Sequence, residues 1–103
     1  MVGNYKGHFT YSQLGILMSA PQSQGVYYCG WVNPQKLLVP LYIGRAKGTG
    51  VTINSRLSDH LRNDKWKDVT HFGYITCSLD QEAINLETTE IAKYKPKYNT
   101  VGK

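Results

Sequence analysis

Cysteine is scarce in this chain, with Cys29 and Cys77 as the two examples among 103 residues. They do not form a CxxC pair, and no histidines are grouped around either of them. A zinc site is therefore not expected. We interpret both as reduced thiols in the core of an intracellular protein, although two strand cysteines could also meet.

Long hydrophobic runs are lacking as well. The apolar stretch 14–20 is too short to span a membrane, and it has neither a basic leader nor a convincing cleavage site. Membrane insertion and secretion are therefore not expected. Internal repeats, low-complexity runs and linkers are also missing. A hydrophobic content of 41% is enough for one ordinary core, so we expect a single domain over residues 1–103.

Acidic residues are few, at 7 against 12 lysines and arginines, which gives a net charge of +5 and a pI of about 9.3. This balance favours polyanions such as nucleic acids or acidic membrane surfaces. The chain also has 8 tyrosines and 2 tryptophans. Aromatic side chains beside basic ones suit contacts with sugars, bases and phosphates. Most tyrosines in a small domain nevertheless belong to its core and strands.

The periodicity of apolar residues predicts alternating helices and strands. In chain order these are a helix over 11–20, a strand over 25–32, a strand over 37–44, a helix over 52–63, a strand over 69–77 and a helix over 78–94. Pro40 places part of the second strand at a sheet edge. Ser78 and Gln81 fit a capping box for the last helix. The expected fold class is α+β, with a small three-stranded antiparallel sheet flanked by helices.

Two tripeptides flank the predicted hairpin: Gly25-Val26-Tyr27 and Tyr42-Ile43-Gly44. They resemble the signature tripeptides of the GIY-YIG nuclease superfamily, with valine in place of the first isoleucine. Later positions that match the family pattern are Arg56, His60, Glu87, Pro96 and Asn99. The resemblance covers about residues 25–99 and leaves 1–24 as an N-terminal helical extension. It is especially close to the nuclease domain of excision-repair endonucleases, and it extends to homing endonucleases.

The resemblance implies an intracellular endonuclease, cytoplasmic or nucleoid-associated, that hydrolyses DNA phosphodiester bonds by a one-metal mechanism. One Mg²⁺ or Mn²⁺ per active site is implied. Branched and damaged DNA are among the candidate substrates, and a homodimer or a separate targeting subunit is compatible with the pattern. The implied residues are Tyr27, Tyr42, Arg56, His60 and Glu87 for catalysis, with Glu87 also binding the metal, and Arg45, Lys47 and Asn99 for substrate binding.

Glu87 is also indicated by the helical pattern alone. At about 100° per residue, Ala83, Ile91 and Tyr94 fall in one narrow arc around it. A carboxylate within an apolar stripe costs free energy unless it is paired or bound to metal. We therefore predict a metal ligand, with a buried ion pair to an arginine as the alternative. Glu90, at the edge of the same face, is interpreted as a solvated or supporting carboxylate.

Each remaining catalytic candidate has a chemical role. Tyr27 is expected to activate the attacking water, but a phenol has a pKa of about 10, so this role requires Arg45 and Arg56 to lower it. Tyr42 is expected to position the phosphate or the water. Arg56 suits the charge of the transition state through its fork of donors. His60 either binds phosphate or moves a proton, or is structural.

Two alternative functions remain open at this stage. The first is a module of the same fold that binds nucleic acid but is catalytically inactive. The second is a small structural domain whose tyrosines serve only for packing. Metal-dependent cleavage of a labelled duplex distinguishes both from a nuclease.

Overall fold

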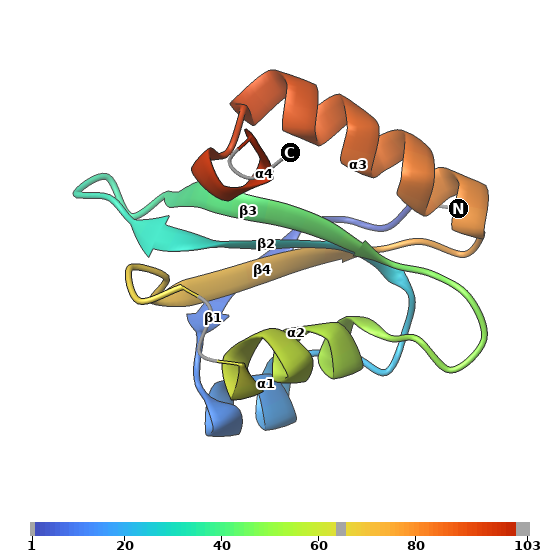
Figure 1. The fold of residues 1–103 in the computed structure, drawn as a ribbon, viewed down its shortest axis with the longest axis horizontal. Coiled ribbons are helices and arrows are strands. Elements are labelled where there is room, and N and C mark those ends of the chain that lie inside the picture. The colour runs from blue at the N-terminus through green and yellow to red at the C-terminus, as the bar shows by residue number, and fades with distance from the viewer. Residues whose placement is uncertain (1, 64–65, 101–103) are drawn as a thin grey trace.

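A four-stranded antiparallel sheet lies between two layers of helices, in a computed structural model that describes residues 2–63 and 66–100. The elements are β1 (Lys6–Thr10), α1 (Gln13–Ser19), β2 (Gly25–Val32), β3 (Leu38–Ala46), α2 (Ile53–Arg62), β4 (His71–Thr76), α3 (Asp80–Tyr94) and α4 (Lys97–Thr100). The strand order is β1-β4-β2-β3. Helices α1 and α2 cover one face of the sheet, and α3 and α4 cover the other (Figure 1). The predicted α+β class is confirmed.

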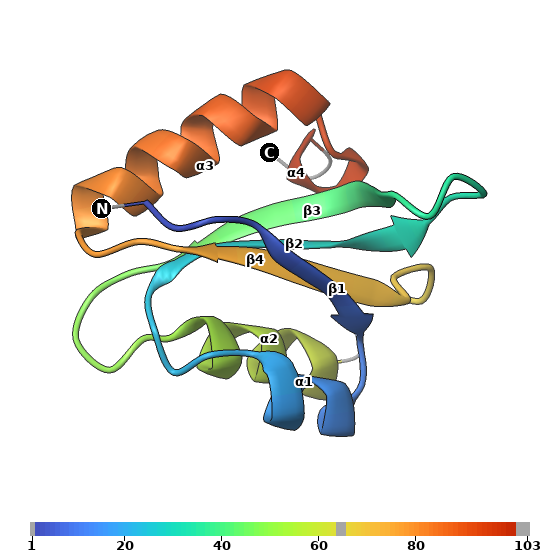
Figure 2. The same cartoon turned by 180° about the vertical axis from the view of Figure 1, so that it is seen from behind.

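The sheet has one strand more than the sequence predicted. β1 pairs antiparallel with β4 and forms the edge of the sheet opposite β3; it lies in front of β4 in Figure 2. It belongs to residues 1–24, so the prediction of a purely helical extension is wrong. The sequence of β1 does not show the alternation of apolar and polar residues that predicts a strand. The reason is that its pairing register shifts between Gly7 and Phe9, which interrupts the alternation of side chains.

The start of α3 also differs from the prediction. Leu79, rather than Ser78, is the residue that precedes the helix. The carboxylate of Glu82 accepts hydrogen bonds from the backbone N–H of Ser78 at 3.0 Å and of Leu79 at 3.1 Å. The predicted capping box with Gln81 is therefore wrong by one residue. The short helix α4, which follows Pro96, was not predicted.

Other predicted elements are confirmed. β2 has the predicted bounds, Gly25–Val32, and β3 with Pro40 lies at the edge of the sheet. Thr52 caps α2, since its hydroxyl accepts a hydrogen bond from the backbone N–H of Ser55 at 3.0 Å. Within the described residues, no helix is long and apolar enough to cross a membrane.

The sheet separates two hydrophobic cores, and β2 contributes to both. Successive residues of a strand point to opposite faces, so Tyr27 packs under α2 whereas Tyr28 packs under α3. Cys29 belongs to the first core and Cys77 to the second. Both are buried, free thiols, as predicted, and their places on opposite faces exclude the disulfide alternative.

Candidate active site

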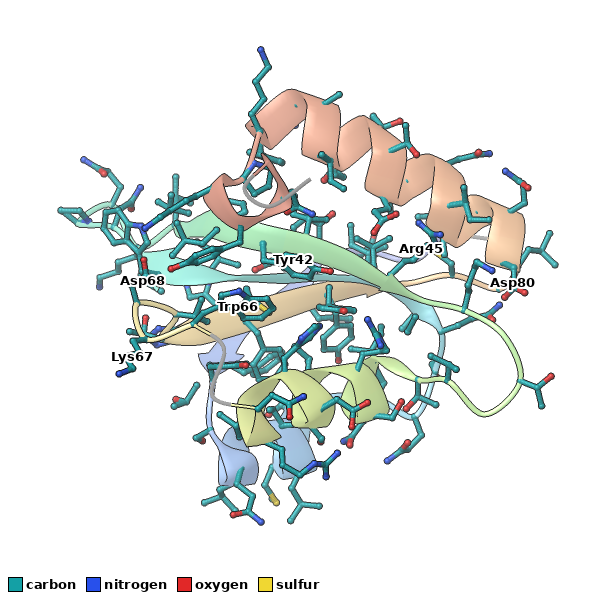
Figure 3. The ribbon with its side chains drawn as sticks, in the orientation of Figure 1. Tyr42, Arg45, Trp66, Lys67, Asp68 and Asp80 are labelled. Carbon is teal, nitrogen blue, oxygen red and sulfur yellow. The ribbon has the colours of Figure 1, made fainter. Side chains whose placement is uncertain are left out.

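Five of the eight predicted site residues line one pocket between β3, α2 and α3. Its volume is about 430 Å³, and its lining consists of Tyr42, Arg45, Lys47, Val51, Arg56 and Glu87. Of these, the sequence analysis missed only Val51. Figure 3 shows Tyr42 and Arg45 along β3, with Arg45 at the end nearer to α3. A second cavity of about 490 Å³, between α1 and α2, contains none of the predicted residues.

A buried tyrosine–histidine pair lies next to this pocket. The Tyr27 hydroxyl and Nε2 of His60 are 2.9 Å apart, and the exposed fractions of these residues are 0% and 7%. Arg56 stands one turn before His60 on α2, and its guanidinium lies beside the Tyr27 hydroxyl. The spacing of four residues places both side chains on the helix face that covers β2, as the sequence indicated.

The environment of Tyr27 raises the pKa of its hydroxyl well above the usual range. Burial is the largest cause, and Tyr42 adds to it, while Arg56 opposes the shift without cancelling it. Burial likewise raises the pKa of Tyr42. Arg56 thus acts in the direction that a base role for Tyr27 requires, but within the chain's own residues the net shift of the Tyr27 pKa is upward. The hydroxyl is the donor to His60 when Nε2 is unprotonated, and the acceptor when Nε2 carries the proton.

Glu87 projects from α3 into the pocket, where it forms an ion pair with Arg45. The exposed fractions of the two side chains are 13% for Glu87 and 38% for Arg45. The ion pair with an arginine, given above as the alternative, is thus present, and the carboxylate is not left uncompensated against Ala83. Glu90 does not line the pocket; it accepts a hydrogen bond of 2.7 Å from the Tyr28 hydroxyl.

The donor set of this pocket fits a hydrated magnesium ion. Glu87 is the one carboxylate among its lining residues, beside Arg45, Lys47 and Arg56. Nowhere in ranges 2–63 and 66–100 do three Asp, Glu, His or Cys side chains gather to hold a metal. Mg²⁺ tolerates a single protein ligand because it keeps waters and takes phosphate oxygens. The excess of positive charge favours phosphate over a bare cation.

Gly44 allows the two signature tyrosines to meet across the β2–β3 ladder. It lies directly opposite Tyr27. A Cβ atom at this position would lie 2.5 Å from the Tyr27 hydroxyl oxygen and 2.7 Å from the Tyr42 ring. Any other residue would therefore displace at least one of the two rings.

Asn99 holds the middle residue of the second signature tripeptide. Its Oδ1 accepts from the Ile43 backbone N–H at 2.8 Å, and its Nδ2 donates to the Ile43 carbonyl at 2.8 Å. Asn99 thus supports β3 through backbone hydrogen bonds, whereas the resemblance implied substrate binding. Asn99 is 8% exposed and is not among the residues that line the pocket.

The sequence analysis missed Trp66, which contacts two of the candidate catalytic residues. Its ring centroid lies 4.7 Å from that of Tyr42 and 4.6 Å from that of His60. Figure 3 shows Trp66 beside Tyr42, below β3. The available signal was weak: a tryptophan flanked by Lys65 and Lys67 in the connection between a helix and a strand.

The two signature tripeptides lie on the paired strands β2 and β3. Helix α2 with Arg56 covers one face of these strands, and helix α3 with Glu87 covers the other. This arrangement defines a GIY-YIG type of domain. No protein-family model matches the sequence. UvrABC system protein C of Clostridium beijerinckii is 33% identical over 97 residues, which cover 85% of this chain and 14% of that protein. The protein of the same name from Bacteroides thetaiotaomicron is 29% identical over 93 residues, covering 86% and 15%. The chain thus spans a small part of the length of these relatives.

Solved structures agree with these matches. The GIY-YIG N-terminal endonuclease domain of UvrC from Thermotoga maritima, bound to its catalytic magnesium, has a TM-score of 0.64 and 33% identity, covering 82% of this chain and 91% of that one. A tyrosine-to-phenylalanine variant of that domain has a TM-score of 0.63 and 34% identity, covering 82% and 90%. The chain belongs to the GIY-YIG nuclease family, and the resemblance found in the sequence is confirmed.

Proposed function

We propose that this chain is an endonuclease that hydrolyses DNA phosphodiester bonds with one Mg²⁺ or Mn²⁺ bound through Glu87. The observation that carries the proposal is the pocket, which brings Glu87 and Tyr42 together with Arg45, Lys47 and Arg56. The T. maritima domain of the same family supports it, being an endonuclease domain that holds a catalytic magnesium.

The basic side chains of the pocket have different roles in binding a phosphate. Lys47 and Arg45 are exposed enough to meet the backbone of an approaching strand. Arg45 exchanges its contact with Glu87 for a phosphate oxygen, which leaves the carboxylate to the metal. Arg56 is in position to stabilise the additional charge of the transition state. The bound ion supplies Lewis acidity, which polarises the phosphate.

Tyr27 and His60 handle the proton of the attacking water in this proposal. With Nε2 of His60 unprotonated, the Tyr27 hydroxyl donates to it across 2.9 Å, and beside the contact with Arg56 one lone pair of its oxygen remains to accept from the water. As the water attacks phosphorus, its proton passes to the Tyr27 oxygen and the tyrosine proton passes to Nε2. This arrangement requires no stable phenolate, in agreement with the raised pKa of Tyr27.

Divalent metal is expected to be essential for cleavage and to bind weakly. The free protein offers one carboxylate among three cationic side chains, so we expect a Mg²⁺ affinity in the range of about 1 mM. Nicking of a labelled duplex, measured across a Mg²⁺ titration and in EDTA, tests this. Full activity in EDTA, or a metal that survives dialysis, contradicts the proposal. A protein that binds the duplex but never cuts it is the inactive binding module.

Replacement of Tyr27 by phenylalanine should lower the cleavage rate by about 10² or more, since only the hydroxyl is lost. It should leave duplex affinity nearly unchanged. The unfolding free energy should fall by about 1 kcal/mol, because the His60 ring loses a buried partner.

Tyr28→Phe is the matched control for this experiment. It also removes a tyrosine hydroxyl hydrogen bond, of 2.7 Å to Glu90, but on the other face of the sheet. Single-turnover rates, filter binding and thermal melts are compared for both variants. Ordinary activity of Tyr27→Phe, or equal rate losses in both variants, would reduce Tyr27 to a packing residue.

A further inference from the structure

Trp66 belongs to an aromatic stack that begins at the pocket wall. Its ring is nearly parallel to that of Tyr42, at an interplanar angle of 28° and a centroid distance of 4.7 Å. On α4, the ring of Tyr98 is also nearly parallel to it, at 27° and 5.9 Å. The His60 ring contacts Trp66 at 4.6 Å with a 41° tilt. Trp66 therefore joins two residues of the site to the C-terminal helix.

The segment that carries Trp66 is itself held in place. A turn closes behind it, with the backbone N–H of Val69 donating to the Trp66 carbonyl at 3.3 Å. Asp68 then accepts a hydrogen bond of 2.5 Å from the Tyr98 hydroxyl and pairs with Lys97 at 3.4 Å. The connection between α2 and β4 is thus fastened to α4 by both stacking and charge. Figure 3 shows Trp66 and Asp68 on this connection, below β3.

The α4 helix restrains β3 at a second point, next to Tyr42. Asn99 binds both backbone polar groups of Ile43. The backbone beside Tyr42 is therefore fixed by Asn99, whereas its ring is fixed by Trp66. A ring packed on the face of another aromatic has few alternative rotamers, because leaving the stack gives up contact area.

We propose that Trp66 is a positioning residue that holds the Tyr42 ring, and with it His60, in the geometry needed for cleavage. This inference rests on the proposed nuclease function for its effect on rate. Small displacements of a positioned group are costly, since about 1 Å can lower a rate by about 10²-fold. Trp66 does not line the pocket, so it acts through Tyr42 rather than on the substrate.

The test compares Trp66→Leu with Trp66→Phe, using Trp31→Leu as the control. Trp31 lies near the end of β2 and is 40% exposed, with none of the catalytic candidates among its ring contacts in the described residues. Trp66→Leu should lower kcat by about 10-fold with KM and duplex Kd within about twofold of wild type. Trp66→Phe should restore most of the rate, and Trp31→Leu should not change it.

A double-mutant cycle shows whether Trp66 acts through the Tyr42 hydroxyl. In a Tyr42→Phe background, which keeps the ring, Trp66→Leu should cost less than about a third of its effect in wild type. Multiplicative losses would overturn the inference. So would a rise in Kd with unchanged kcat, which would make Trp66 a DNA contact, or equal rates for Trp66→Leu and wild type.

Crystal structures of the variants test the positioning independently of cleavage. Tyr42 should keep its rotamer in Trp66→Phe and leave it in Trp66→Leu, while thermal melts show that both remain folded. An unchanged Tyr42 in folded Trp66→Leu refutes the positioning role, whatever the activity. Failure of wild-type protein to cut DNA in Mg²⁺ refutes the nuclease proposal instead, and the rotamer of Tyr42 still decides the role of Trp66.

Discussion

Glu87→Gln should abolish detectable cleavage, with a loss of at least about 10³-fold, because the metal and its stabilisation of the phosphate charge are lost together. The pocket offers no replacement, since its other polar lining residues are Tyr42, Arg45, Lys47 and Arg56. Single-turnover nicking across a Mg²⁺ titration measures the loss. Higher metal concentration should not rescue the variant.

The same substitution should leave the fold nearly intact. Arg45 loses its ionic partner in this variant, but its side chain is 38% exposed and can be solvated by water. The glutamine carbonyl can also still accept a hydrogen bond from it. An ion pair of this exposure contributes about 1 kcal/mol at most, so we expect a small decrease in melting temperature in EDTA. A loss of several kcal/mol would mean that the pair is mainly structural.

Glu90→Gln is the matched control, since it removes a carboxylate one turn along α3 that bonds Tyr28 rather than facing the pocket. Its cleavage rate should equal that of wild type. A Glu87→Gln protein that still cuts DNA contradicts the assignment of Glu87 as the metal ligand. Equal inactivity of both variants would point instead to damage along the whole helix.

Arg56→Ala should lower the cleavage rate of bound substrate by about 10² or more, since donors aimed at the transition state are worth that much in enclosed sites. Duplex affinity should fall only slightly, because Arg45 and Lys47 remain in the pocket. Comparing single-turnover rates at saturating protein with equilibrium binding separates the two effects.

Arg62→Ala serves as the control on the same helix. Arg62 is solvent-exposed, and its guanidinium pairs with Asp59 on the surface of α2. Its removal should change neither rate nor affinity by more than about twofold, as is usual for surface ion pairs. If Arg56→Ala weakens binding in proportion to activity and leaves the bound rate unchanged, Arg56 is a docking residue.

Local patterns carried much of the information about the site. Alternation along β2 placed Tyr27 and Tyr28 on opposite faces, and helical spacing placed Arg56 and His60 on one face of α2. These relations span at most four residues, so backbone geometry alone determines them. The inward position of Glu87 on α3 was predictable for the same reason.

Contacts between distant segments were beyond such patterns. The partner of Glu87 is Arg45, 42 residues away. The stack of Trp66 on Tyr98 joins the connection between α2 and β4 to the short helix α4, and neither segment is long enough to show a periodicity. The strand β1 forms on the edge of β4, where unpaired backbone N–H and C=O groups are available for hydrogen bonds. These bonds hold β1 in the sheet although its register is irregular.

The sequence by itself determined which chemical groups are present and which face of its own element each one takes. Tertiary structure decided what surrounds those groups. Tyr27 shows the difference. Its place on β2 follows from the alternation of side chains along a strand. The direction of its pKa shift depends on two opposing effects, since burial raises the pKa and the nearby Arg56 lowers it, and the effect of burial is the larger. Desolvation and Coulomb interactions depend on distances between atoms of different elements, and no short-range pattern encodes those distances.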